Sequence, residues 1–235
     1  MMEMQCRLSQ AAICAALAAA LVLAPPPTAA AQPSKTESLW FDPTQLPSFT
    51  GVVDRFLPNP DGSVDRLIFK EGPQIAFPPD AFEAVREVAP VGRPLIVWGI
   101  RARSAPVITM LAFGVPDGEP TILDRFYWRP EPGQKHARQE MLLIGTVWVP
   151  YLSTQGKTAG AILENGDVIR VEPKVAAILK DRFVAGAKIV AEGTGVDTPL
   201  GKAMDAERIG ASIATLERLP SPEPATPGGG PPSAR

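Results

Sequence analysis

Basic and aromatic residues are interleaved in residues 123–129, and this is the one place in the 235-residue chain where they are. The segment reads Leu-Asp-Arg-Phe-Tyr-Trp-Arg, and Lys135 follows it closely. Aromatic rings beside positive charges hold single-stranded nucleic acids by stacking, without choosing a sequence. In the alternative interpretation, Phe126 and Trp128 fill a seam between two domains while the arginines stay in solvent.

Side chains for hydrolytic, redox or metal chemistry are scarce. His136 is the one histidine of the chain, and a lone histidine needs carboxylate or thiolate partners to bind zinc. The chain has no nucleophile elbow, no Ser-x-x-Lys element and no phosphate-binding loop. Gly193-Thr194-Gly195 lacks the third glycine and following helix of a dinucleotide loop, and we expect it to end a strand. We therefore expect a protein that is not an enzyme and uses no metal or cofactor.

The elements that must position the basic and aromatic residues occur twice. Residues 51–99 align with residues 145–193 at an offset of 94 positions, without a gap. Nine of the 49 aligned residues are identical, and five of the nine are glycines and one is a proline. Glycine and proline fix turns, so two copies of one fold retain them first. The repeat therefore predicts two copies of one domain.

Each copy predicts the order strand, strand, strand, helix, strand, strand from its hydrophobic periodicity. Turn sequences such as Asn165-Gly166 separate the strands, and Gly72 and Gly166 are expected to adopt positive φ in tight turns. The expected strands are residues 50–57, 64–70, 74–77, 94–102 and 107–113, then 141–151, 159–164, 168–171, 187–192 and 202–208. The expected helices are residues 80–89 and 174–183.

This order resembles the oligonucleotide/oligosaccharide-binding (OB) fold, a five-stranded Greek-key barrel. The first copy contains, in order, the motifs Gly-x-Val, Asn-Pro-x-Gly and Gly-x-x-Ile-x-Phe-Pro-Pro, followed by two further glycines. This pattern more narrowly resembles that of a group of exported bacterial OB-type proteins of unassigned activity. The resemblance implies an all-β protein of two tandem five-stranded OB-type barrels, each with a short helix between strands three and four. In this fold the ligand usually binds on strand two and the neighbouring loops.

We therefore expect the first barrel and the bridge that follows it to carry the ligand surface. Arg66 and Lys70 leave strand two on one side, and the second copy has no basic residue at the matching positions. Asp61 and Asp65 could hold a cation beside a hairpin, but turn chemistry explains them better, since the second copy lacks both. The predicted ligand-binding residues are Arg55, Arg66, Lys70, Arg101, Arg103, Arg125, Tyr127, Trp128 and Arg129.

Residues 1–31 have the pattern of a secretory signal. Arg7 precedes an apolar run over residues 11–24, and small residues end at Ala31. The run is shorter than the roughly 20 residues that span a bilayer, so we expect cleavage after Ala31 and no membrane span afterwards. A retained membrane anchor is the alternative. Both cysteines lie in this segment, so the mature chain would be a periplasmic or secreted bacterial protein without disulfides.

Export should therefore remove residues 1–31, because the small-residue site follows an apolar run too short to remain as an anchor. Mass spectrometry of the protein from its native host should find a mature chain that begins at Gln32. A chain that starts at Met1 or Met4 and runs to Arg235 would contradict this prediction.

The sequence predicts six regions along the chain. They are a signal peptide (1–31), an N-terminal arm (32–48), a first OB-type barrel (49–115), a bridge (116–140), a second OB-type barrel (141–219) and a disordered tail (220–235). Each barrel has a complete set of strands, so we expect the two barrels to fold independently.

Charge and composition limit the function classes. The formal net charge is −2, so no overall positive field attracts polyanions. We expect an exported, non-enzymatic binding module for a polymer or a small ligand, with single-stranded nucleic acid and anionic glycans among the candidates. The alternative is a periplasmic protein-interaction or envelope-stress component that binds an envelope protein and no polymer. Salt-sensitive DNA binding would separate these classes.

Overall fold

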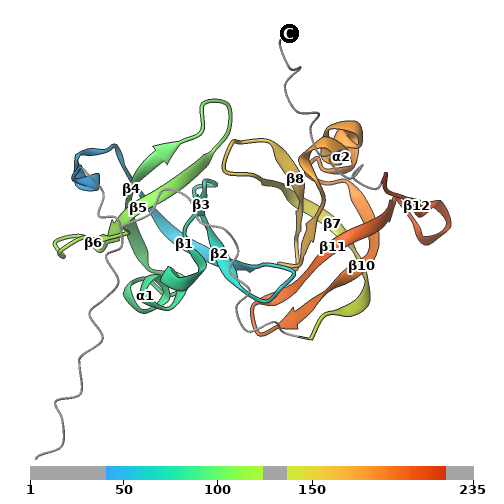
Figure 1. Ribbon diagram of the computed structural model, residues 1–235, viewed down its shortest axis with the longest axis horizontal. Helices are drawn as coiled ribbons and strands as arrows, with labels where there is room; N and C mark the ends of the chain where they lie inside the picture. Colours follow the sequence, from blue (N-terminus) through green and yellow to red (C-terminus); the bar gives the residue numbers. More distant parts are fainter. Residues whose placement is uncertain (1–40, 124–136, 221–235) are drawn as a thin grey trace, which may run out of the picture. The chain divides into compact units, whose positions relative to one another are not determined.

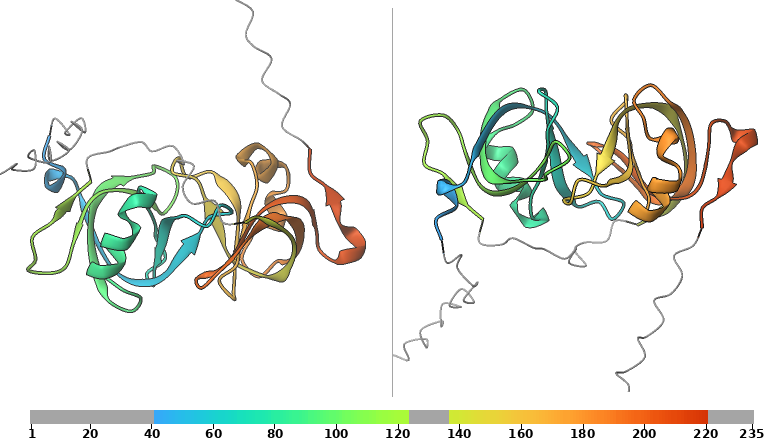
Figure 2. Two further views of the ribbon diagram at one scale, coloured as in Figure 1. Left: turned by 60° about the horizontal axis from the view of Figure 1, so that its bottom comes forward. Right: turned by 90° about the horizontal axis from the view of Figure 1, so that it is seen from above.

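The computed structural model describes residues 41–123 and 137–220 (Figure 1). Both described segments fall in one compact unit, Thr36–Arg235. Their strands form two six-stranded sheets, and five strands of each sheet close into a barrel (Figures 1 and 2). The predicted fold class, two tandem five-stranded barrels in an all-β protein, is confirmed.

The first barrel closes through one parallel pair of strands. It consists of β1 (Ser48–Pro58), β2 (Val64–Phe69), β3 (Gln74–Ala76), β4 (Pro94–Arg101) and β5 (Val107–Gly114). β1, β2 and β3 form an antiparallel meander, and β4 pairs with the other edge of β1. β5 pairs antiparallel with β4 and parallel with β3, which completes the ring. The short β6 (Thr121–Ile122) extends the sheet beyond β5.

The second barrel repeats this topology. It consists of β7 (Gln139–Leu152), β8 (Thr158–Leu163), β9 (Val168–Arg170), β10 (Lys188–Thr198) and β11 (Gly201–Gly210). β11 pairs antiparallel with β10 and parallel with β9, so the same strand position closes both rings. The short β12 (Glu217–Arg218) is added to β11.

Each barrel has its own apolar interior. Leu67 and Phe69 alternate along β2 and point into the first core, and Ala161 and Leu163, 94 positions later, do the same in the second. Helix α1 (Phe82–Val88) follows β3 through a 3-10 turn and packs Val85 on the first core. Helix α2 (Pro173–Ile178) packs Ala176 on the second. The predicted helix between strands three and four is present in both barrels.

Two elements differ most from the sequence expectation. α2 ends at Ile178 and continues as a 3-10 turn, Lys180–Arg182, so the second helix is shorter than expected. β10 is longer and contains Gly193 and Gly195, which were expected to end a strand. A Cβ at Gly193 would lie 2.1 Å from the carbonyl oxygen of Asp205, and one at Gly195 would lie 2.0 Å from that of Ala203. These glycines let the backbones of β10 and β11 approach closely at these two positions.

The turn glycines Gly72 and Gly166 have φ angles of +105° and +95°, as the sequence predicts. A β-branched residue is strained in this conformation, so Gly72→Val and Gly166→Val should each cost about 1–3 kcal/mol. Denaturant unfolding of the two single variants tests this prediction. A midpoint equal to that of the wild type in both variants would contradict it.

A third apolar cluster joins the two barrels, and we call this contact the junction. Its buried members come from both copies: Leu57, Ile68, Tyr151, Ala159, Ile162, Val168 and Ala203. A barrel expressed alone would expose its half of this cluster to water, which costs free energy in proportion to the apolar area. Independent folding of the barrels stays a prediction.

Candidate binding site at the junction of the barrels

The two barrels contact each other through the outward faces of their first three strands. Ile68 on β2 points away from the first core and into the junction, while its neighbours Leu67 and Phe69 point inward. Ile162, 94 positions later, does the same on β8, and Leu57 and Tyr151 form a second matching pair. The junction is therefore built from the same surface of both repeats.

Gln74 links β3 to the end of β7 across the junction, and its side chain is 2% exposed. Its amide nitrogen donates to the carbonyl oxygen of Pro150 at 2.7 Å, and its amide oxygen accepts from the N–H of Leu152 at 3.1 Å. One side chain therefore satisfies two backbone groups of the other barrel, much as a neighbouring strand would.

Arg66 lies beside Gln74 and is only 3% exposed. Its guanidinium donates to the carbonyl oxygen of Leu152 and, at 3.2 Å, to the amide oxygen of Gln74. The guanidinium carbon lies 4.4 Å from the centre of the Tyr151 ring. Arg66 is thus held in the junction by backbone, amide and aromatic contacts together.

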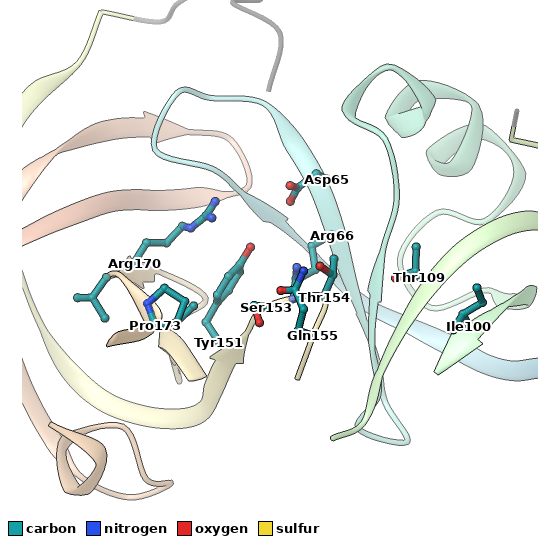
Figure 3. A pocket seen from close by; sticks show the side chains of 12 residues that line it. Asp65, Arg66, Ile100, Thr109, Tyr151, Ser153, Thr154, Gln155, Arg170 and Pro173 are labelled. Carbon is teal, nitrogen blue, oxygen red and sulfur yellow. The ribbon is translucent and has the colours of Figure 1, made fainter. Parts of the chain in front are cut away.

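Arg170 reaches the same tyrosine from β9. Its guanidinium carbon lies 4.9 Å from the ring centre of Tyr151, and a guanidinium nitrogen donates to Asn59 of the first barrel at 2.5 Å. Figure 3 shows Tyr151 between Arg170 and Arg66. Contacts of this kind between a cation and a ring are favourable, and more so when water is excluded.

Burial dominates the ionisation of Tyr151, which is 2% exposed. It raises the pKa of the phenol above its usual value of 10.0, although the charges of Arg66 and Arg170 lower it. The pKa of Arg170 also lies above its usual range, because the charges of Tyr151 and of nearby acids such as Asp65 together outweigh the effect of burial. At neutral pH the ring is therefore uncharged and the guanidinium is positive.

These side chains line a pocket of about 430 Å³, which is within the usual range for small-molecule sites. Its charged residues are Arg66, Arg170 and Asp65 (Figure 3). Ser153, Thr154 and Gln155, in the turn after β7, add hydroxyl and amide groups to the wall. The rest of the wall consists of Ile100, Thr109, Tyr151, Ala159, Val171 and Pro173. Among the described residues, neither Oδ1 of Asp65 nor Nε of Arg66 has a hydrogen-bond partner, and both atoms are buried.

The structure separates the predicted ligand-binding residues. Arg66 lines the junction pocket, and Arg55 is half-buried with its guanidinium 4.3 Å from the ring centre of Trp148 in the second barrel. Lys70, Arg101 and Arg103 are exposed and do not line the pocket. The remaining four predicted residues lie outside the described part of the chain, namely Arg125, Tyr127, Trp128 and Arg129.

Sequence reasoning missed Tyr151, Arg170 and the role of Asp65. Asp61 accepts hydrogen bonds from the N–H and hydroxyl of Ser63, which is the turn chemistry expected for it, but Asp65 faces the pocket. The identity of Ile68 and Ile162 in the repeat was a usable signal. An apolar residue kept on the outer face of the same strand in both copies indicates a buried contact on that face.

Two further observations concern residues 41–123 and 137–220. No group of three or more His, Cys, Asp and Glu residues in these segments could hold a metal ion. No helix described there is long and apolar enough to cross a membrane. The chain matches no known protein-family model, and no significant match was found among curated proteins.

Proposed function

We propose that this protein is an exported, non-enzymatic binding module and that its junction pocket takes a small anionic molecule. The observation that carries the proposal is the charge of the pocket wall, which combines two guanidinium groups with one carboxylate. Both guanidinium groups are already oriented by contacts with the protein, so little side-chain entropy remains to be lost when an anion binds.

A small ligand fits this surface better than an extended polymer. A polymer that follows the second and third strands of the first barrel needs an open face, but Arg66, Ile68 and Gln74 on that face are 3% exposed or less. The second barrel covers them. Single-stranded nucleic acid and anionic glycans are thereby less favoured as ligands than a molecule that fits the pocket.

Isothermal titration calorimetry of the mature chain at low and high salt tests the proposal. The probes are inorganic phosphate, a set of small carboxylates, a labelled single-stranded oligonucleotide and an anionic glycan. We expect saturable binding of at least one small anion and a loss of about tenfold or more in affinity in Arg170→Gln, because a charge-assisted hydrogen bond is removed. Arg93→Gln, an exposed arginine that does not line the pocket, is the matched control.

Two results would overturn the proposal. If none of the small anions binds at low salt, the junction pocket is not an anion site. If the oligonucleotide or the glycan binds and the small anions do not, the ligand is a polymer on another surface. Circular dichroism of Arg170→Gln shows whether the variant keeps its fold, since Arg170 also contacts Asn59.

One observation favours the alternative of a periplasmic protein-interaction component. Leu142 and Ile144 are 45% and 58% exposed on the outer face of β7, and two neighbouring exposed apolar side chains are typical of a protein contact. If they bind an envelope protein, Leu142→Ser/Ile144→Ser should abolish co-purification of that partner from the native host and leave binding in the junction pocket unchanged.

A further inference from the structure

We infer that the ligand of the junction pocket is an α-amino acid, bound as a zwitterion with its carboxylate at the guanidinium groups and its ammonium group at Asp65. This inference rests on the proposed function and specifies the chemical class of the ligand. It is carried by the acidic residue in a pocket whose other charged residues are both basic.

The carboxylate of Asp65 has an oxygen atom that lacks a hydrogen-bond donor in the part of the chain that the structure describes. Its Oδ1 atom is buried and, among the described residues, has no hydrogen-bond partner. No ion pair described for those residues joins Asp65 to Arg66 or Arg170, although all three line one pocket. A buried carboxylate oxygen without a partner is costly, so such an atom marks a place where a donor is expected.

The guanidinium groups are held by contacts with groups other than Asp65. Arg66 is fixed by the carbonyl oxygen of Leu152 and by the ring of Tyr151, and Arg170 is fixed by Asn59 and the same ring. Nε of Arg66 is also buried without a partner in the described chain. The pocket wall thus has one acceptor atom and one donor atom without partners among the described residues, which matches a ligand that has both kinds of group.

An α-amino acid supplies both groups on adjacent carbon atoms. Its carboxylate accepts from guanidinium N–H groups, and its ammonium group donates to a carboxylate. Ile100, Val171 and Pro173 provide an apolar part of the wall for a side chain. A simple carboxylic acid would leave Asp65 without a donor, and a simple amine would leave the guanidinium groups without an anion.

Both barrels contribute to the site. Asp65 and Arg66 come from β2 of the first barrel, and Arg170 comes from β9 of the second. Tyr151, which orients both arginines, comes from β7. The zwitterion site therefore exists only where the two barrels meet, and this gives the repeat a role in ligand binding.

Four ligands that share the side chain of leucine test the inference by calorimetry on the mature chain at pH 7. They are L-leucine, 2-hydroxy-4-methylpentanoate, 4-methylpentanoate and 3-methylbutylamine, which carry acid and amine, acid and hydroxyl, acid alone and amine alone. We expect leucine to bind about tenfold or more tightly than 4-methylpentanoate, since only leucine gives Asp65 a charged donor. The hydroxy acid should lie between them, and the amine should bind weakest.

Asp65→Asn should lower the affinity for leucine to that for 4-methylpentanoate and should leave the affinity for 4-methylpentanoate unchanged. Asp117→Asn, in an exposed turn away from the pocket, should change neither affinity. If Asp65→Asn does not fold, the order of the four ligands on the wild type still decides the question.

Distinct results overturn the inference and the proposed function. If 4-methylpentanoate binds the wild type as tightly as leucine, the zwitterion inference is wrong while the anion-binding function stands. If Asp65→Asn weakens all four ligands equally, Asp65 supports the shape of the pocket and does not select the ammonium group. If none of the four and no other small anion binds, the proposed function fails and the inference with it.

Discussion

Gly99→Ala and Gly193→Ala should each destabilise the protein by about 3 kcal/mol or more, which is at the upper end of the usual cost of overpacking. The two glycines are 94 positions apart and belong to the identities of the repeat. A Cβ at Gly99 would lie 2.0 Å from the carbonyl oxygen of Thr109, and one at Gly193 would lie 2.1 Å from that of Asp205. These contacts are with backbone, so no side-chain rotation can relieve them.

Each of these glycines lies at an irregularity of strand pairing. The register of β4 and β5 shifts between Trp98 and Gly99, and that of β10 and β11 shifts between Glu192 and Gly193. A glycine at such a bulge lets the barrel bend while its strands stay close. The methyl group of alanine would push the paired strands apart in either barrel.

Denaturant unfolding measured by circular dichroism tests the prediction. Gly114→Ala is the matched control in the first barrel, because its nearest atom would be 3.4 Å from the new Cβ, an ordinary van der Waals contact. If Gly99→Ala and Gly193→Ala unfold at the denaturant midpoint of Gly114→Ala, the close strand contacts do not exist.

Tyr151→Ala should cost about 3–5 kcal/mol, as expected for truncation of a large buried aromatic side chain. Tyr151 is 2% exposed, belongs to the junction cluster and lies within 5 Å of two guanidinium groups. Its loss removes both cation–ring contacts and leaves a cavity between the barrels. Tyr151→Phe keeps the ring and should cost far less than the alanine variant.

The pH dependence of stability provides a second measurement on the same residue. The pKa of Tyr151 is raised above 10.0 in the folded protein, so the unfolded chain ionises first as the pH rises. The free energy of unfolding of the wild type, relative to that of Tyr151→Phe, should therefore be constant below pH 10 and decrease above it. Denaturant unfolding between pH 8 and pH 11 checks this, and equal pH profiles for the two proteins would contradict it.

Absorbance titration can isolate the same group, because Tyr127 and Tyr151 are the two tyrosines of the chain. Tyr127→Phe leaves Tyr151 as the one phenol, and its ionisation should then begin at a pH above that of free tyrosine. Ionisation at the usual pH would mean that the junction admits water to the ring.

The fold could be predicted closely from local sequence features. The signals that predict it act over a few residues: turn sequences such as Asn165-Gly166, apolar residues at every second position, and proline after the third strand. For this reason β1 through β5 lie close to their expected bounds. The expected length of β10 was too short, because glycines such as Gly193 and Gly195 can either end a strand or permit two strands to pair closely. Which of the two occurs depends on the partner strand, here β11.

The candidate site could be predicted only in part, and Arg66 shows why. Alternation along β2 places Arg66 and Ile68 on the outer face, but it does not say whether that face meets water or protein. A long basic side chain is stable in either setting if its guanidinium finds acceptors. The acceptor here, the carbonyl oxygen of Leu152, lies 86 residues away in the chain.

By itself, then, the sequence determined two copies of one barrel, their turns and the inward face of each strand, because these depend on contacts between near neighbours in the chain. The tertiary structure decided that the outer faces of the first three strands of each barrel meet, and that Asp65, Arg66, Tyr151 and Arg170 share one pocket. The physical reason is that this pairing depends on complementary surfaces from distant residues, which no local pattern encodes.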